Sequence, residues 1–178
     1  GVGGGKGVIS ADIWEEEGFQ VPDLSPVVRE ELKEKTPEVW DWIRNPVDAS
    51  IFGKASIPLV NLLKTISKEE KFDILVANMI SDDPFPKDIW LETSVRELLD
   101  SILAIKEEGK AVVCIMETGE ISSQDKENWR WSTIADIRKH IIDQGVPVFS
   151  SPSRAAKTLG KFVDYWVWKL ERLSSGFE

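Results

Sequence analysis

A cluster of glycines near the start of the chain has the composition of an anion-binding site. Residues 1–7 contain five glycines, and glycine allows sharp turns and the close approach of a ligand to the backbone. Apolar residues at helical spacing follow from Val8 and predict a helix that ends at Gly18. The start of a helix has unpaired N–H groups and a partial positive charge, which favour a phosphate or a carboxylate. The alternative is a leader that binds nothing.

The composition argues against several other kinds of function. The chain has 178 residues, 22 of them basic and 31 acidic, and a net charge of −9 disfavours electrostatic binding of nucleic acid. One histidine and one cysteine cannot form a zinc cluster or an internal disulfide. No apolar run approaches the roughly 20 residues needed to cross a bilayer, and no secretory signal is visible. We expect no metal site, no nucleic-acid or membrane partner, and a cytoplasmic location.

The two side chains that could act as a nucleophile or a base have structural interpretations that we favour. Cys114 lies in an apolar segment, residues 111–116, that predicts a buried strand in which cysteine is a small hydrophobe. His140 lies near the end of a predicted helix, where a surface position beside the helix dipole is favoured over catalysis.

Elements that alternate between strand and helix must position the glycines. Strands are predicted at residues 43–45, 72–80, 111–116 and 146–149. Helices are predicted at residues 8–17, 26–35, 55–66, 93–108, 125–144 and 152–173. Strands without polar alternation between helices are typical of a parallel sheet covered on both faces. The fold class is therefore α/β, with a parallel sheet between helices and a single domain over residues 1–178.

Three loops are expected at the carboxyl edge of this sheet, where ligands bind in such folds. They are residues 3–7, 45–50 and 78–86. Asn45 and Asp48 in the second loop could shape a phosphate site, but Asn-Pro-Val-Asp also makes its own turn, and we favour that structural role. A strand should precede Gly1, so we expect that the chain is part of a longer polypeptide whose first strand is missing here.

Four motifs in order resemble one family of enzymes. They are Gly3-Gly-Gly-Lys-Gly-Val-Ile-Ser-Ala-Asp12, Glu17-Gly18, Val21-Pro-Asp-Leu-Ser25 and Asn45-Pro-Val-Asp48. Residues 145–155 also match the closing strand and helix of that family. The chain is similar over almost its whole length to the C-terminal domain of the α chain of NDP-forming acyl-CoA synthetases, such as ADP-forming acetyl-CoA synthetase. That domain is related to a domain of succinyl-CoA synthetase.

The resemblance implies a three-layer flavodoxin-like fold and a role in phosphoryl transfer. In the family, a phosphohistidine in a neighbouring domain carries phosphate between an ATP-grasp domain and the site of acyl phosphate and CoA chemistry. The residues that it implies for binding phosphohistidine phosphate or acyl phosphate are Gly3, Gly4, Gly5, Gly7 and Val8. CoA, ADP or ATP, and Mg²⁺ belong to the full enzyme. This chain alone should be inactive, with the CoA-binding, phosphohistidine and ATP-grasp domains as its partners.

Five residues are expected in loops near this site: Lys6, Asn45, Asp48, Asn78 and Ser81. Lys6 could add a charge-assisted contact to the anion or point to solvent. Asn78 matches an asparagine of succinyl-CoA synthetase, but Ser81 and Asp82 replace the glycine pair that follows it there. The expected reaction is acyl-CoA + ADP + phosphate to carboxylate + CoA + ATP. The alternative is a non-catalytic, synthetase-like binding or regulatory module.

The tryptophans of the predicted last helix also have two interpretations. Trp166 and Trp168 could pack in the core, as aromatic side chains commonly do. They could instead form a surface on which sibling domains dock, since aromatic residues are enriched at interfaces.

Overall fold

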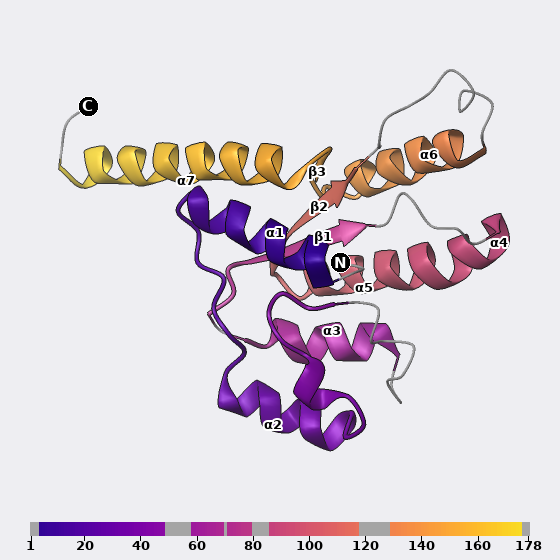
Figure 1. Cartoon of the computed structure of the whole chain (residues 1–178). Helices are drawn as coiled ribbons and strands as arrows, with labels where there is room; N and C mark the ends of the chain where they lie inside the picture. Colours follow the sequence, from indigo (N-terminus) through magenta and orange to yellow (C-terminus); the bar gives the residue numbers. More distant parts are fainter. Residues whose placement is uncertain (1–3, 49–57, 70, 80–85, 118–128, 176–178) are drawn as a thin grey trace.

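The computed structural model describes residues 4–48, 58–69, 71–79, 86–117 and 129–175. Within these residues, the sheet has three parallel strands in the order β1-β2-β3: β1 (Ile74–Met79), β2 (Ala111–Met116) and β3 (Val148–Phe149). Ile74 pairs with Ala111, and Cys114 pairs with Val148. The chain is therefore a mixed α/β protein with a parallel sheet (Figure 1).

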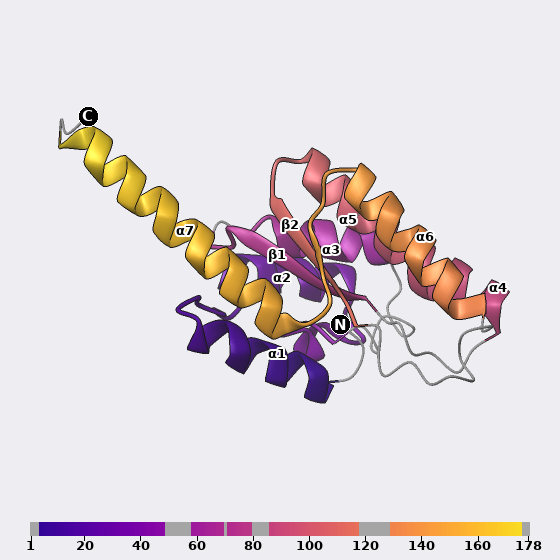
Figure 2. The same ribbon diagram turned by 90° about the horizontal axis from the view of Figure 1, so that it is seen from above.

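Helical elements make up most of the remaining described chain. They are α1 (Gly4–Glu16), α2 (Pro26–Lys35), η1 (Trp40–Trp42), α3 (Leu59–Ser67), α4 (Lys87–Ile89), η3 (Trp90–Arg96), α5 (Glu97–Glu107), α6 (Trp129–Asp143) and α7 (Pro152–Ser174). Viewed from above, α7 extends well beyond the sheet (Figure 2).

The alternation of side chains along β2 divides the apolar core into two clusters. Val112, Cys114 and Met116 belong to the larger cluster, which includes buried side chains of α2, α3, α5 and α6. Val113 and Ile115 belong to the smaller cluster, to which α1 and α7 contribute. Helices therefore cover both faces of the sheet, and α1 lies on the same side as α7.

Helix boundaries follow local residue chemistry. Ser25 and Ser151 cap α2 and α7: each hydroxyl oxygen accepts a hydrogen bond from a backbone N–H three residues later, and proline follows each serine. Gly18, Gly109 and Gly145 follow the ends of α1, α5 and α6 with positive φ angles of 89°, 90° and 73°, which glycine adopts without strain. The predicted helix ends at these glycines are confirmed.

Several predicted boundaries were wrong. Residues 43–45 form no strand, and the carbonyl of Ile43 instead accepts a hydrogen bond from Arg29 Nη1 at 3.3 Å. The helical segment before β2 begins at Lys87, directly after Pro86, instead of at residue 93. The last strand is only Val148–Phe149.

The shortening of β3 has a local cause. Val146 N–H donates to the Ile141 carbonyl and closes α6, while Pro147 has no N–H and contributes only its carbonyl to Cys114, at 2.9 Å. The helices predicted at residues 55–66 and 125–144 begin with residues outside the described chain. Their described parts are α3, which begins after Pro58, and α6.

The first helix begins earlier than predicted. Gly4, Gly5 and Gly7 lie inside α1, so the described glycines form the first turns of the helix and do not form a loop before it. Among the described residues, no helix is both long and apolar enough to cross a membrane.

Candidate functional site

The start of α1 lies beside the carboxyl edge of the sheet. Lys6 Nζ is 3.6 Å from Glu117 Oε2, and Glu117 directly follows β2. Figure 1 shows the first turn of α1 near the ends of β1 and β2. In open parallel sheets, ligands bind outside this edge. The predicted glycine-rich segment is therefore at the edge where a ligand is expected.

Residues 45–48 pack against the first two turns of α1. A Cβ atom added at the buried Gly7 would lie 3.4 Å from both Cβ and Cγ of Pro46. A Cβ atom added at Gly4 would lie 3.4 Å from Oδ2 of Asp48. These are ordinary contact distances, so an alanine would still fit at either position, and residues 45–48 lie directly against this side of α1. Two motifs that are distant in the sequence thus meet at one place.

The carboxylate of Asp48 lies beside the first turn of α1. Asp48 is half-buried, and its Oδ2 atom lies beside Gly4 in the first turn of α1. A negative charge at a helix N-terminus interacts favourably with the helix dipole. A carboxylate this close repels an external anion, which lowers the expected affinity of the helix start for one.

The free N–H groups of α1 belong to its first turn. In a helix that begins at Gly4, the N–H groups of Gly4, Gly5 and Lys6 have no partner four residues earlier within the helix. The backbone N–H of Val8 is placed to donate to the carbonyl of Gly4 within the helix, so it is not available to an anion. The geometry thus favours the backbone of Gly4 and Gly5 as donors to an anion, and it adds that of Lys6.

Asn45 holds the loop in place. Its Nδ2 atom donates to the carbonyl of Pro22 at 2.8 Å, so the side chain joins the loop to the segment before α2. This bond spans 23 residues, whereas the sequence predicted a turn closed by local bonds. Asn45 therefore has a structural role, as we favoured, but it acts through a contact with a distant segment instead of through a local turn.

Asn78 faces the same side of the sheet as α1. It pairs with Ile115 in the parallel register, is half-buried, and follows Ile74 and Val76, which belong to the smaller core cluster. The side chain brings an amide to the face on which the start of α1 lies. Gly3 and Ser81, also predicted site residues, are outside the described residues.

Glu117 is a site residue that the sequence reasoning missed. The alternation of β2 could have located it, because it continues the face of Val113 and Ile115 toward α1. Its ion pair with Lys6 joins two exposed side chains, 45% and 71% accessible, and such pairs contribute little to stability. Lys6 is therefore exposed and has an acidic neighbour.

The two candidate catalytic side chains lie away from this site. Cys114 is fully buried in β2, and burial raises the pKa of its thiol to about 12, so the thiol is not a nucleophile at neutral pH. His140 is exposed in the last turn of α6. Among the described residues, no group of three histidine, cysteine, aspartate or glutamate side chains is arranged to hold a metal ion.

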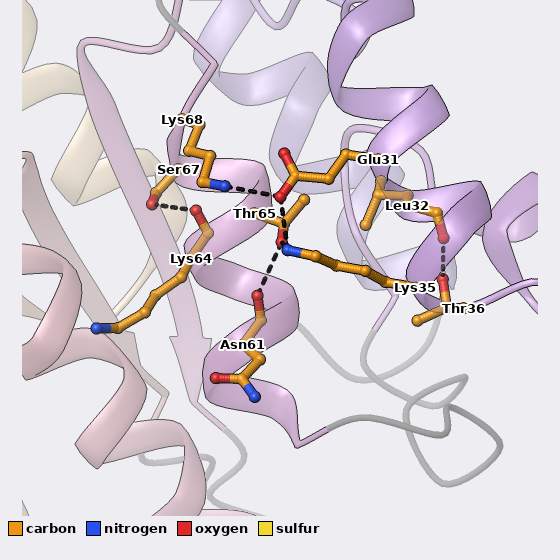
Figure 3. A network of polar contacts seen from close by, with 9 residues as sticks. All are labelled: Glu31, Leu32, Lys35, Thr36, Asn61, Lys64, Thr65, Ser67 and Lys68. Carbon is orange, nitrogen blue, oxygen red and sulfur yellow. Dashed lines mark hydrogen bonds and ion pairs between the residues drawn. The ribbon is translucent and has the colours of Figure 1, made fainter.

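A second polar region is a hollow of about 370 Å³ between α2, α3 and α5. It is lined by Lys35, Asn61, Lys64, Thr65, Lys68 and Glu108. Glu31 Oε1 accepts hydrogen bonds from Lys35 Nζ at 2.5 Å and Lys68 Nζ at 2.7 Å, and both lower the pKa of Glu31 (Figure 3).

The lysines around this hollow are already used within the chain. Lys35 also donates to Thr65 Oγ1 at 3.1 Å, and Lys64 points away from Lys35 and pairs with Glu108 at 2.9 Å. The network joins α2 to α3, and the start of α1 remains the better candidate for a site.

Comparison of the chain with protein-family models found no match, and comparisons with curated proteins and with solved structures found no significant one. The arrangement of residues around the start of α1 is therefore the basis for any statement about function.

Proposed function

We propose that this chain is a flavodoxin-like domain of an NDP-forming acyl-CoA synthetase, and that the start of α1 holds a phosphoryl group. The observation that carries the proposal is the meeting of the glycine-rich first turn with residues 45–48 at the carboxyl edge of a parallel sheet. Both segments belong to the sequence motifs that resemble the synthetase family, and they are distant in the sequence.

The topology supports the three-layer flavodoxin-like arrangement. In that fold, three consecutive parallel strands lie side by side at one end of the sheet, as β1, β2 and β3 do.

The chemistry of this domain is electrostatic. The N–H groups of Gly4 and Gly5, together with the helix dipole, stabilise negative charge on a phosphoryl group at a fixed position. Lys6 adds one positive charge near the same end of the helix. The phosphorylated histidine, CoA, ADP or ATP, and Mg²⁺ belong to the neighbouring CoA-binding, phosphohistidine and ATP-grasp domains, and we place the assembly in the cytoplasm.

A phosphate titration followed by amide NMR tests the anion site. We expect the amide resonances of Gly4, Gly5 and Lys6 to shift and saturate, because their N–H groups are free to donate. Those at the start of α2 serve as the internal control, since that helix is capped by its own chain. Shifts that are no larger at α1 than at α2 would overturn the site.

A second function, a non-catalytic binding or regulatory module, is favoured by the charges at the same site. Asp48 and Glu117 place two carboxylates near the start of α1, and carboxylates repel an anionic substrate. Reconstitution with phosphohistidine and ATP-grasp domains distinguishes the two. Formation of ATP from an acyl-CoA, ADP and phosphate supports the synthetase, and its failure across a broad acyl panel supports the module.

A further inference from the structure

Almost every residue in the second half of α7 is exposed. In the first half, Ala155 and Ala156 are fully buried and pack with Trp14 of α1. At Gly160, near the middle of α7, an added Cβ would lie 3.5 Å from the carbonyl oxygen of Glu17, which directly follows α1. Beyond this point α7 extends away from the rest of the fold (Figures 1 and 2).

The apolar face that packs against α1 continues along the extended half. At 100° per residue, six exposed side chains fall on the same side of α7 as Ala155 and Ala156, within a sector of about 140°. They form what we call the α7 stripe: Phe162, Val163, Trp166, Val167, Leu170 and Leu173. Leu170 and Leu173 are 60% and 67% exposed. A contiguous exposed patch of this kind marks an interaction surface.

The shape around the stripe limits what can cover it. Because α1 and the sheet cover this side of α7 in its first half, the stripe and the body of the protein form an inner corner. A flat membrane cannot reach the floor of such a corner without meeting the body. If two α7 helices packed in parallel, the bodies of the two copies would both lie at the same end of the helix pair, on its axis.

An antiparallel second copy fits this corner. Each extended α7 then lies along the stripe of the other copy, and each tip lies beside the other body. Complete burial of the six stripe side chains in both copies removes on the order of 1,200 Å² of surface, the lower limit for a specific stable interface. We propose that two copies of this chain associate through antiparallel α7 stripes. The proposal is independent of the anion site.

The aromatic side chains outside the stripe provide the control. Trp168 lies on the opposite side of α7, where the Arg172 guanidinium stacks 4.9 Å from its ring centre. Trp166 and Trp168 are similarly exposed, at 41% and 50%. The two tryptophans are therefore matched in type, helix and exposure, and they differ in the face that they occupy.

Sedimentation velocity of the full chain tests the association. We expect a dimer of the 20.1 kDa chain at micromolar concentration, a monomer for Trp166→Glu and a dimer for Trp168→Glu, with circular dichroism showing that both variants keep their helices. A monomeric wild type at all concentrations overturns the proposal. So does equal dissociation by the two variants, or a monomer that sediments with phosphatidylglycerol vesicles.

Cysteine crosslinking tests the direction of the pair, because Cys114 is buried and does not interfere. Val163→Cys and Leu173→Cys chains, mixed under oxidising conditions, should form a mixed disulfide dimer. Leu173→Cys alone should not crosslink, since antiparallel packing separates the two tips. Efficient crosslinking of Leu173→Cys alone would show parallel packing and overturn the proposal.

Discussion

The starts of α1 and α2 are two helix N-termini in one chain, and they are built from different residues. At α2, Ser25 N–H donates to Glu69 Oε2 at 2.7 Å, Val28 N–H donates to Ser25 Oγ at 3.4 Å, and Pro26 has no N–H. At α1, glycines occupy the first turn, and the nearby carboxylate, Asp48, comes from a different segment.

The difference separates a structural terminus from a candidate binding terminus. The α2 start is closed by its own serine and by the buried carboxylate of Glu69, which satisfies a backbone donor and complements the helix dipole. The α1 start has no side chain of its own to close its first turn before Lys6. Changes at α2 should therefore affect stability and leave anion binding unchanged, whereas changes at α1 should affect anion binding.

Removal of the Glu69 carboxylate should have the largest effect on stability. Glu69→Ala leaves the Ser25 N–H without its acceptor and should lower the free energy of unfolding by about 1.5–3 kcal/mol, as for a hydrogen bond to a charged group. Urea unfolding measures this loss. Glu69→Gln, which keeps an acceptor, should lose less. A change in phosphate affinity in either variant would contradict the separation of the two termini.

Substitution of Gly7 should test the packing between α1 and the loop at residues 45–48. Gly7→Leu places a large side chain against Pro46 and should cost about 1–3 kcal/mol, as for overpacking. Gly7→Ala fits at ordinary contact distance and should be neutral or stabilising by up to about 1 kcal/mol, because alanine favours helix. Equal stabilities of the two variants would show that this contact does not constrain the residue.

Removal of the Asp48 charge should strengthen anion binding. Asp48→Asn keeps the shape of the side chain and removes the carboxylate beside Gly4, so the phosphate dissociation constant should fall about tenfold, equivalent to about 1.4 kcal/mol. Calorimetric titration measures it, with the exposed Asp41→Asn as the control. Weaker or unchanged binding in Asp48→Asn would show that the carboxylate does not oppose the anion.

The sequence predicted where these helices start and end better than it predicted which distant residues contact their ends. The helix start at residue 26 and the helix end at Gly18 were predicted from local signals, because capping and positive φ depend on the residue itself, and both were confirmed. The pairing of Ser25 with Glu69 spans 44 residues, and no local pattern indicates it. The contact of Asp48 with Gly4 was likewise predicted only as a general nearness of loops at one sheet edge, because tertiary packing decides which atoms meet.

The contribution of Glu69 should depend on pH. Hydrogen bonds from Ser25 hold the pKa of Glu69 below its ordinary value, so the folded state favours the ionised form. The resulting stabilisation is present at neutral pH and is lost as the pH falls through the lowered pKa. The stabilities of wild type and Glu69→Gln, measured by urea unfolding from pH 7 to pH 3, should therefore converge in acid. A constant difference would contradict the role of the charge.

Loss of the Lys6 charge should have the smallest effect, and only on binding. Lys6→Gln should change the free energy of unfolding by less than about 0.5 kcal/mol, because its pair with Glu117 is exposed. It should weaken phosphate binding about threefold at low salt and less at high salt, since salt screens an exposed charge. Lys33→Gln is the matched control: Lys33 also forms an exposed 3.6 Å pair, with Glu30 on α2. Equal weakening of phosphate binding by both variants would assign the effect to net charge and not to the start of α1.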